Sequence, residues 1–165
     1  MLTLDEIKEL IKPIQIVKVL EIEKHPNADR LLLPTVDFGD HQKKVITGAP
    51  NMTIGDYVPY LGEGNVIPGY LIMDGERIML EKKMLRGLES DSMVLAVDEI
   101  GLGRDHSGLW ILTGRDGIND EFLGKSLLEI LTEAELQTIF ENQKKEEVKT
   151  EPEAEPQAEA IENIN

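Results

Sequence analysis

The amino-acid sequence predicts a mainly β domain with a short helix before it and a helical segment after it. From residue 14 to about residue 112, short stretches rich in Val, Ile, Leu and Tyr alternate with Gly, Asn and Asp. This spacing is typical of a small β-barrel or sandwich. Residues 4–12 and 122–145 instead carry apolar side chains at helical spacing.

Residues 4–12 are predicted to form a short amphipathic helix. Thr3, with Glu6 three residues later, has the pattern of a capping box, in which each side chain accepts a hydrogen bond from the other residue's backbone N–H. Pro13 ends the helix because its ring cannot be accommodated in a helix interior. The apolar face consists of Leu4, Ile7, Leu10 and Ile11.

Seven stretches in the central part of the chain are predicted to be strands. They are rich in β-branched or other apolar residues and are separated by turn residues. Asp74-Gly75 predicts a tight hairpin, because glycine tolerates a positive φ. The predicted strands are residues 14–23, 31–36, 44–47, 57–61, 70–73, 77–80 and 92–97.

The C-terminal part is predicted to be helical and then disordered. Residues 147–165 consist mainly of Glu, Lys, Pro, Ala and Gln, a composition that cannot bury enough surface to fold alone. The chain is therefore divided into an N-terminal helix (1–12), a barrel domain (13–115), a helical extension (116–146) and a disordered acidic tail (147–165). The helical face of the extension includes Leu127, Leu128, Leu131, Leu136 and Phe140, of which Leu127, Leu128 and Leu131 either pack on the barrel or form a dimer surface.

The net charge of −15 is concentrated near the C-terminus. Residues 13–115 carry a balance of only −4, whereas residues 116–165 carry −10. Phosphate binding depends on Lys and Arg, so the total charge argues against a nucleic-acid partner. The mildly acidic body weakens that objection.

Catalytic motifs are missing from the sequence. It has no cysteine, its three histidines are scattered, and Gly101-Leu102-Gly103 lacks the third glycine of a dinucleotide-binding loop. We therefore expect no enzymatic activity, no cofactor and no metal site. No apolar run approaches the roughly 20 residues of a membrane span, and the N-terminus lacks the features of a signal peptide, so we expect a cytoplasmic protein.

Two motifs are more specific. The first runs from residue 19 to residue 31 and contains His25-Pro26-Asn27-Ala28-Asp29; it is followed by residues 36–39 and 45–51. The second is the segment 82–93, with Leu85-Arg86-Gly87 near its centre. Together they resemble the tRNA-binding domain shared by phenylalanyl-tRNA synthetase beta chains, the C-terminal extension of methionyl-tRNA synthetase and free-standing tRNA-binding proteins.

The beta chain is the most similar of these, because residues 48–51, 98–102 and 105–112 also follow its pattern. The similarity runs from about residue 13 to residue 131 and implies a five-stranded OB-fold barrel. Two features depart from the family pattern: the segment 70–80 is longer than usual, and Ser92 replaces a glycine.

The resemblance also implies a set of RNA-binding residues. Lys82, Lys83 and Arg86, with Arg77 upstream, form the best basic cluster for phosphates. Asn27, Asn51 and Ser90 are the predicted polar contacts. Each has a structural alternative: a solvated surface for the cations and turn chemistry for residues 25–29. Trp110 and Tyr57 fit a core role better than a base-stacking role.

The resulting hypothesis is a non-catalytic tRNA-binding protein, either free-standing or acting in trans with an aminoacyl-tRNA synthetase of the phenylalanyl type. It would recognise tRNA through shape and phosphates more than through base identity. A second hypothesis is a protein-interaction module with little RNA affinity, associated with a synthetase or another partner. A homodimer is compatible with either, and the acidic tail could compete with RNA for the basic groove.

Overall fold

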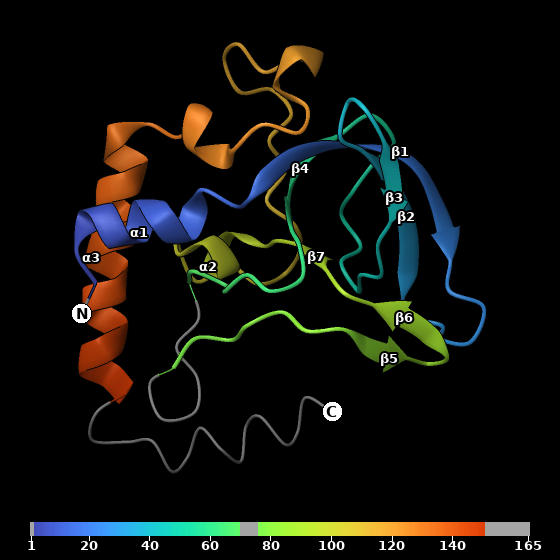
Figure 1. The fold of residues 1–165 in the computed structure, drawn as a ribbon, viewed down its shortest axis with the longest axis horizontal. Helices are drawn as coiled ribbons and strands as arrows, with labels where there is room; N and C mark the ends of the chain where they lie inside the picture. Colours follow the sequence, from blue (N-terminus) through green and yellow to red (C-terminus); the bar gives the residue numbers. More distant parts are fainter. Residues whose placement is uncertain (1, 70–75, 151–165) are drawn as a thin grey trace.

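The computed structural model describes residues 2–69 and 76–150, with side chains as far as Gln143. The strands lie between residues 15 and 94, and the two longest helices, α1 and α3, lie before and after them (Figure 1). The elements, in order, are α1 (Leu4–Ile11), β1 (Gln15–Lys24), β2 (Leu32–Asp37), β3 (Gln42–Lys44), β4 (Tyr57–Leu61), β5 (Lys83–Leu85), β6 (Leu88–Ser90), β7 (Met93–Val94), α2 (Val97–Ile100), the 3-10 helices η1 (Asp120–Phe122) and η2 (Leu127–Glu129), and α3 (Glu133–Thr150).

The main sheet has five antiparallel strands in the order β3-β2-β1-β4-β7. It curls into a half-barrel, which confirms the mainly β class and the five strands predicted. Among the described residues no backbone ladder joins the edge strands β3 and β7. An ion pair of 2.8 Å between Lys43 Nζ and Asp91 bridges β3 to the segment just before β7.

The two faces of the curled sheet bury two apolar clusters, as the alternation of side chains along a strand requires. On one face Ile16 and Leu61 join the residues of α1 and α3, including Ile7 and Ile139. The second cluster is formed by the strands and the loops between them; it contains Val17, Val19, Val36, Phe38, Val45, Met52, Val58, Tyr60, Val94 and Leu109.

The C-terminal segment is joined to the start of β1. The Ile16 N–H donates to Lys125 O, the Gly124 N–H donates to Ile16 O, and the Leu127 N–H donates to Ile14 O. Leu127 is completely buried, and Leu128 and Leu131 pack against the same cluster. These leucines therefore pack on the body of the protein, as one of the two predicted alternatives required.

The N-terminal helix is confirmed as α1, and three of the seven predicted strands, 14–23, 31–36 and 57–61, are confirmed as β1, β2 and β4 with ends shifted by at most one residue. The predicted helical segment 122–145 consists of the 3-10 helix η2 followed by α3, which begins only at Glu133. The capping box of Thr3 and Glu6 is present at α1, and β4 has the predicted bounds. Residues 92–97 are not one strand: β7 is followed by α2, whose first turn is closed by a hydrogen bond of 2.7 Å from the Ala96 N–H to Glu99.

Other parts of the predicted strand pattern differ in position from the strands that the structure describes. The predicted strand 44–47 is shorter and earlier as β3, with an isolated bridge between Thr47 and Leu32. Part of the predicted hairpin, residues 70–75, lies outside the described residues; residues 77–80 run alongside residues 64–67 instead. The β5–β6 hairpin was not predicted.

The helix α3 continues to Thr150, four residues into the predicted tail. Lys and Glu favour helix, and Pro152 is the first residue that opposes it. The rest of the predicted tail, residues 151–165, lies outside the described residues. Within the described part of the chain, no helix has the length and apolar character needed to span a membrane.

Candidate nucleic-acid interface

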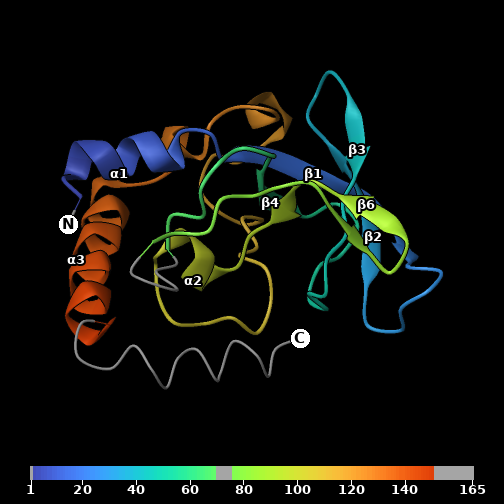
Figure 2. The same cartoon turned by 60° about the horizontal axis from the view of Figure 1, so that its bottom comes forward.

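The predicted basic segment folds into the β5–β6 hairpin, which lies beside β1 and β2 (Figure 2). Leu85 and Leu88 face each other across a two-residue turn formed by Arg86 and Gly87. Both turn residues have positive φ, 51° and 90° respectively. This is the requirement of a type I′ turn, which Asn-Gly normally satisfies. Arg86 is the one described non-glycine residue with positive φ.

The loop between β1 and β2 holds the tip of this hairpin. The Asn27 side-chain amide donates to the carbonyl of Arg86 at 3.0 Å. The Asn27 backbone N–H donates to Nδ1 of His25 at 3.0 Å, so Nε2 carries the proton and donates to the carbonyl of Leu85 at 2.9 Å. His25 is only 4% exposed. We call these three hydrogen bonds the hairpin clamp.

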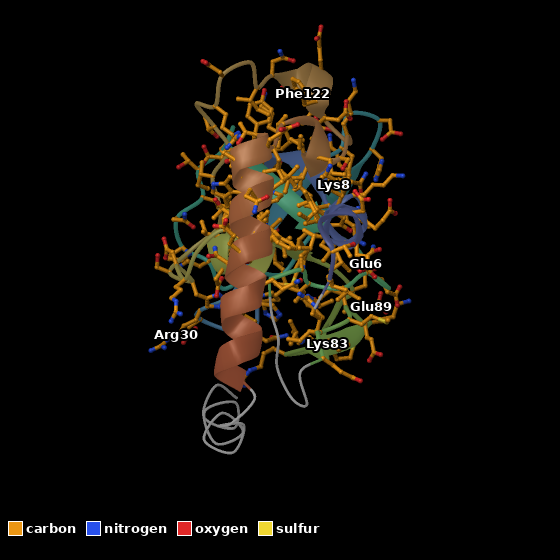
Figure 3. All side chains as sticks on the ribbon, turned by 90° about the vertical axis from the view of Figure 1, so that its left-hand side faces the viewer. Glu6, Lys8, Arg30, Lys83, Glu89 and Phe122 are labelled. Carbon is orange, nitrogen blue, oxygen red and sulfur yellow. The ribbon has the colours of Figure 1, made fainter. Side chains whose placement is uncertain are left out.

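The three predicted cations of the hairpin lie on its exposed surface. Lys82 is 4.0 Å from Glu89, and both side chains are more than half exposed, so this pair contributes little to stability. Among the side chains that the structure describes (residues 2–69 and 76–143), Lys83 and Arg86 have no ion-pair partner. Figure 3 shows Lys83 and Glu89 close together on the hairpin, with Arg30 on the other side of α3 in that view.

The other predicted contacts are not all in the same place. Ser90 pairs with Lys83 in the hairpin ladder but is only 9% exposed. The Asn51 side chain accepts a hydrogen bond from Leu109 N–H at 2.8 Å and donates to Leu109 O at 3.0 Å. The structure thus brings together Asn27, Ser90 and the hairpin cations, and places Asn51 against a different segment.

Arg77 lies at the helical end of the molecule. Its Nε donates to Pro68 O at 2.8 Å, and its guanidinium also donates to Gln143 of α3. Figure 1 places α3 and the β5–β6 hairpin at opposite ends of the molecule. Arg77 is therefore separated from the other predicted cations.

Ser92, which departs from the family pattern, is 7% exposed and follows Asp91, the ion-pair partner of Lys43. The hydrogen bond from Lys43 lowers the pKa of Asp91. The serine in place of glycine is therefore a buried polar residue beside the Lys43–Asp91 ion pair, between the edge strands β3 and β7. Lys43 also lies 5.9 Å from the centre of the Tyr60 ring.

Sequence reasoning missed two features of the hairpin region. Met84 of β5 is 64% exposed; the sequence carried no clear signal for this, because a strand of three residues is too short to show alternation. The role of His25 had no local signal, because its partner Leu85 is 60 residues away.

A second polar cluster lies near α2. Ligand atoms of Asp98, Glu99 and His106 are within 4.8 Å of one another. The hydrogen bond to Asp98, 2.8 Å long, raises the pKa of His106, and burial raises the pKa of Glu99. Asp98 already pairs with His106, and Glu99 accepts a hydrogen bond from the Ala96 N–H. The three side chains therefore have hydrogen-bond partners within the fold.

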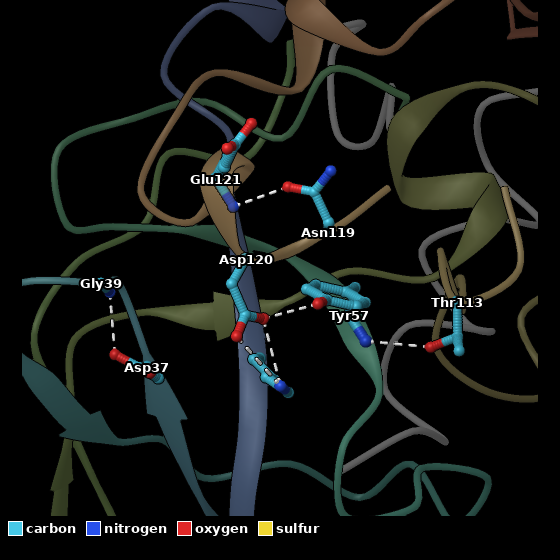
Figure 4. A network of polar contacts seen from close by, with 8 residues as sticks. Asp37, Gly39, Tyr57, Thr113, Asn119, Asp120 and Glu121 are labelled. Carbon is cyan, nitrogen blue, oxygen red and sulfur yellow. Dashed lines mark hydrogen bonds and ion pairs between the residues drawn. The ribbon is translucent and has the colours of Figure 1, made fainter. Parts of the chain in front are cut away.

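A third polar network connects β1, β4 and η1 (Figure 4). The Tyr57 hydroxyl donates to Asp120 at 2.6 Å, and Lys18 Nζ lies 3.1 Å from the same carboxylate. Burial and the bond to Asp120 raise the pKa of Tyr57 to about 12. Tyr57 packs against the first apolar cluster, as does Trp110, so both have the structural role that the sequence favoured.

Comparison with known proteins shows the family. The model of the family described as "Putative tRNA binding domain" matches residues 14–115, which include β1 to β7, the hairpin clamp and α2. The chain belongs to this family.

The chain is also similar to phenylalanine–tRNA ligase beta subunits. That of Dehalococcoides mccartyi (strain CBDB1) is 39% identical over 117 residues, which are 68% of this chain and 14% of the relative. That of Leptospira borgpetersenii is 36% identical over 118 residues, 72% of this chain and 13% of the relative. The chain thus aligns with about a seventh of each subunit, and the predicted resemblance to beta chains is confirmed.

Among solved structures, the chain is similar to a MetRS related protein from Pyrococcus horikoshii. The two share 16% identity, with a TM-score of 0.49, over 77% of this chain and 97% of the other.

Proposed function

We propose that this chain is a non-catalytic tRNA-binding protein that contacts tRNA with the β5–β6 hairpin. The observation that carries the proposal is the family match over residues 14–115. That segment contains Lys82, Lys83 and Arg86 on an exposed hairpin. The protein would act free-standing or in trans with a synthetase of the phenylalanyl type, in the cytoplasm.

The chemistry of the hairpin fits phosphate binding. Arg86 can donate two parallel hydrogen bonds to one phosphate, and the lysines act as point charges. Such contacts carry no sequence information, so recognition would depend on tRNA shape. We further propose that the curled sheet is an OB-type barrel whose seam is closed by the Lys43–Asp91 pair rather than by a backbone ladder.

Among the seven predicted contact residues, we assign phosphate contact to the three hairpin cations. Asn51 and Arg77 have hydrogen bonds that support the fold away from the hairpin. Ser90 is buried behind the hairpin ladder.

The proposal is tested by measuring the affinity for labelled bulk tRNA across a salt series. The change is Lys82→Ala/Lys83→Ala/Arg86→Ala. Each phosphate contact that is lost should flatten the slope of log affinity against log salt by about 0.7 to 0.9. We expect the triple variant to bind more weakly than wild type and with a slope flatter by about 2.

A matched control removes the same charge elsewhere. Lys8→Ala/Lys12→Ala/Lys125→Ala changes three cations of the helical end and should leave the slope nearly unchanged. Equal flattening in both variants would show that only net charge matters and would reject the hairpin as the binding face. No binding by folded wild type at about 50 mM salt would reject tRNA binding itself.

A second candidate function is a protein-interaction module. It is favoured by the acidic balance of −4 in residues 13–115 and by three large apolar side chains that are more than half exposed, namely Ile54, Met79 and Met84. Recovery of a stable synthetase partner from RNase-treated lysate, with no tRNA binding, would support this candidate over the first.

A further inference from the structure

We propose that Asn27 and His25 are positioning residues, which hold the Arg86 turn in the conformation that presents its guanidinium to a tRNA phosphate. This inference rests on the proposed function. It gives Asn27 a different role from the direct RNA contact predicted from the sequence.

The backbone conformation of the Arg86 turn requires stabilising contacts from outside the hairpin. A φ of 51° is unfavourable for a residue with a side chain, because Cβ crowds the following carbonyl oxygen. Asparagine tolerates this region better than arginine does, since its short side chain can bond to the local backbone. A hairpin with three-residue strands has little intrinsic stability with which to offset this cost.

The hairpin clamp supplies that support from the β1–β2 loop. The Asn27 amide and the His25 ring bind the carbonyls of Arg86 and Leu85, two consecutive residues at the tip. Both ring nitrogens of His25 are used, one toward the hairpin and one toward Asn27. Gly87 follows Arg86 with a φ of 90°, and the Asn27 amide nitrogen lies at van der Waals distance, 3.4 Å, from where a Cβ of residue 87 would be.

The clamp binds the backbone of Arg86 and does not engage its side chain. Asn27 binds the backbone carbonyl of Arg86, and among the described residues the guanidinium forms no ion pair. Arg86 is exposed, whereas His25 is buried beneath it. Fixing the backbone at this point reduces the conformational freedom that the turn would lose on binding RNA.

A double-mutant cycle distinguishes positioning from direct contact. The variants are Asn27→Ala, Arg86→Gln and the pair, measured in the full chain with labelled bulk tRNA across a salt series. If Asn27 acts through Arg86, N27A should weaken binding about fivefold, the effect of one net hydrogen bond. In the Arg86→Gln background the same change should have less than about a twofold effect, since coupled residues are not additive.

The salt slope gives the second readout. Arg86→Gln should flatten it by about 0.7 to 0.9, and N27A by part of that amount, because a displaced arginine releases fewer counterions. Asn65→Ala is the matched control; it removes an amide that bonds to Gly62 O in a different turn, and should change neither affinity nor slope. His25→Gln, checked for folding by thermal unfolding, should behave like N27A.

Additive losses with an unchanged slope for N27A would overturn the inference, because a neutral amide that touches RNA directly behaves in that way. A measurement without RNA separates this failure from failure of the proposed function. In the free protein, N27A should increase the fast backbone mobility of Arg86 and Gly87, measured by ¹⁵N relaxation. If wild type binds no tRNA, the proposed function fails; unchanged mobility rejects the clamp whether or not tRNA binds.

Discussion

Arg86 and Met84 illustrate how a short exposed hairpin combines two kinds of contact. Met84 is exposed on β5, next to Lys83 and two residues before the turn residue Arg86, so that an exposed thioether lies among the cations of this segment. Cations bind phosphates, whereas a flexible, polarizable side chain is suited to the apolar surface of a ribose or base. A hairpin of this composition can bind an RNA strand without discriminating between base sequences.

Met84→Gln should therefore weaken tRNA binding about threefold, as expected from the loss of a small buried apolar area. The salt slope should stay the same, because no charge is removed. Titration of bulk tRNA at several salt concentrations measures both quantities. Met79→Gln is a suitable control, since Met79 is 53% exposed but pairs with Val66, away from the hairpin; equal losses in both variants would contradict the prediction.

At the scale of elements, the start of α3 is joined to the body by a bidentate ion pair, in addition to the contacts of Asn142 and Gln143 further along the helix. The Arg115 guanidinium donates to both carboxylate oxygens of Glu135, at 2.8 and 2.7 Å, and also to Ile130 O. Glu135 and Thr132 form a second capping box at the start of α3. Each side chain of the ion pair is 24% exposed, so the pair is partly shielded from water.

Arg115→Met, which keeps most of the aliphatic stem, should lower the free energy of unfolding by roughly 1–3 kcal/mol at pH 7. The hydrogen bond from Arg115 lowers the pKa of Glu135. A carboxylate of this kind stabilises the fold above its unfolded pKa of about 4.3, and the stabilisation is lost as the pH falls through the lower folded value. The difference between wild type and variant should therefore shrink below about pH 4.

Urea unfolding of both proteins between pH 7 and pH 3 measures this difference. Lys18→Met is the control: it breaks an ion pair with Asp120 whose side chain is 63% exposed, and should cause little change. A difference for Arg115→Met that stays constant from pH 7 to pH 3 would refute the assigned role of Glu135.

The sequence predicted elements that carry a local signal. The N-terminal helix was predicted because Thr3 and Glu6 form a capping box, and β4 because five residues of strand-like composition lie between turns. The β5–β6 hairpin was missed because its turn is Arg-Gly rather than Asn-Gly and its strands are too short to show alternation. Its cations were found through the resemblance, whereas the clamp joins residues about 60 apart and has no local signal.

At the scale of the whole molecule, Figure 1 shows helices at one end and the β5–β6 hairpin at the other. The arrangement separates the proposed binding face from the contacts of α3 with α1. The two ends can therefore be altered independently, since sites without shared partners usually behave additively.

The distribution of charge leads to a prediction at this scale. Removal of residues 151–165 leaves α3 whole and deletes five glutamates and no cation. If these residues compete with tRNA for the hairpin cations, the truncated chain should bind more tightly at about 50 mM salt, and the gain should fade at about 0.2 M as screening increases. Identical affinities of the full and truncated chains at low salt would contradict competition between these residues and tRNA.

The contact between Asn51 and Leu109 has an evolutionary consequence. The Asn51 amide exchanges two hydrogen bonds with one residue, as a neighbouring strand would, across 58 positions of chain. Gly108 makes room for it, because an added Cβ would lie only 2.3 Å from Asn51 Oδ1. An ancestor could not replace this glycine first without displacing the amide. Asn51 and Gly108 should therefore be inherited as a pair and should change together in relatives that rebuild this corner.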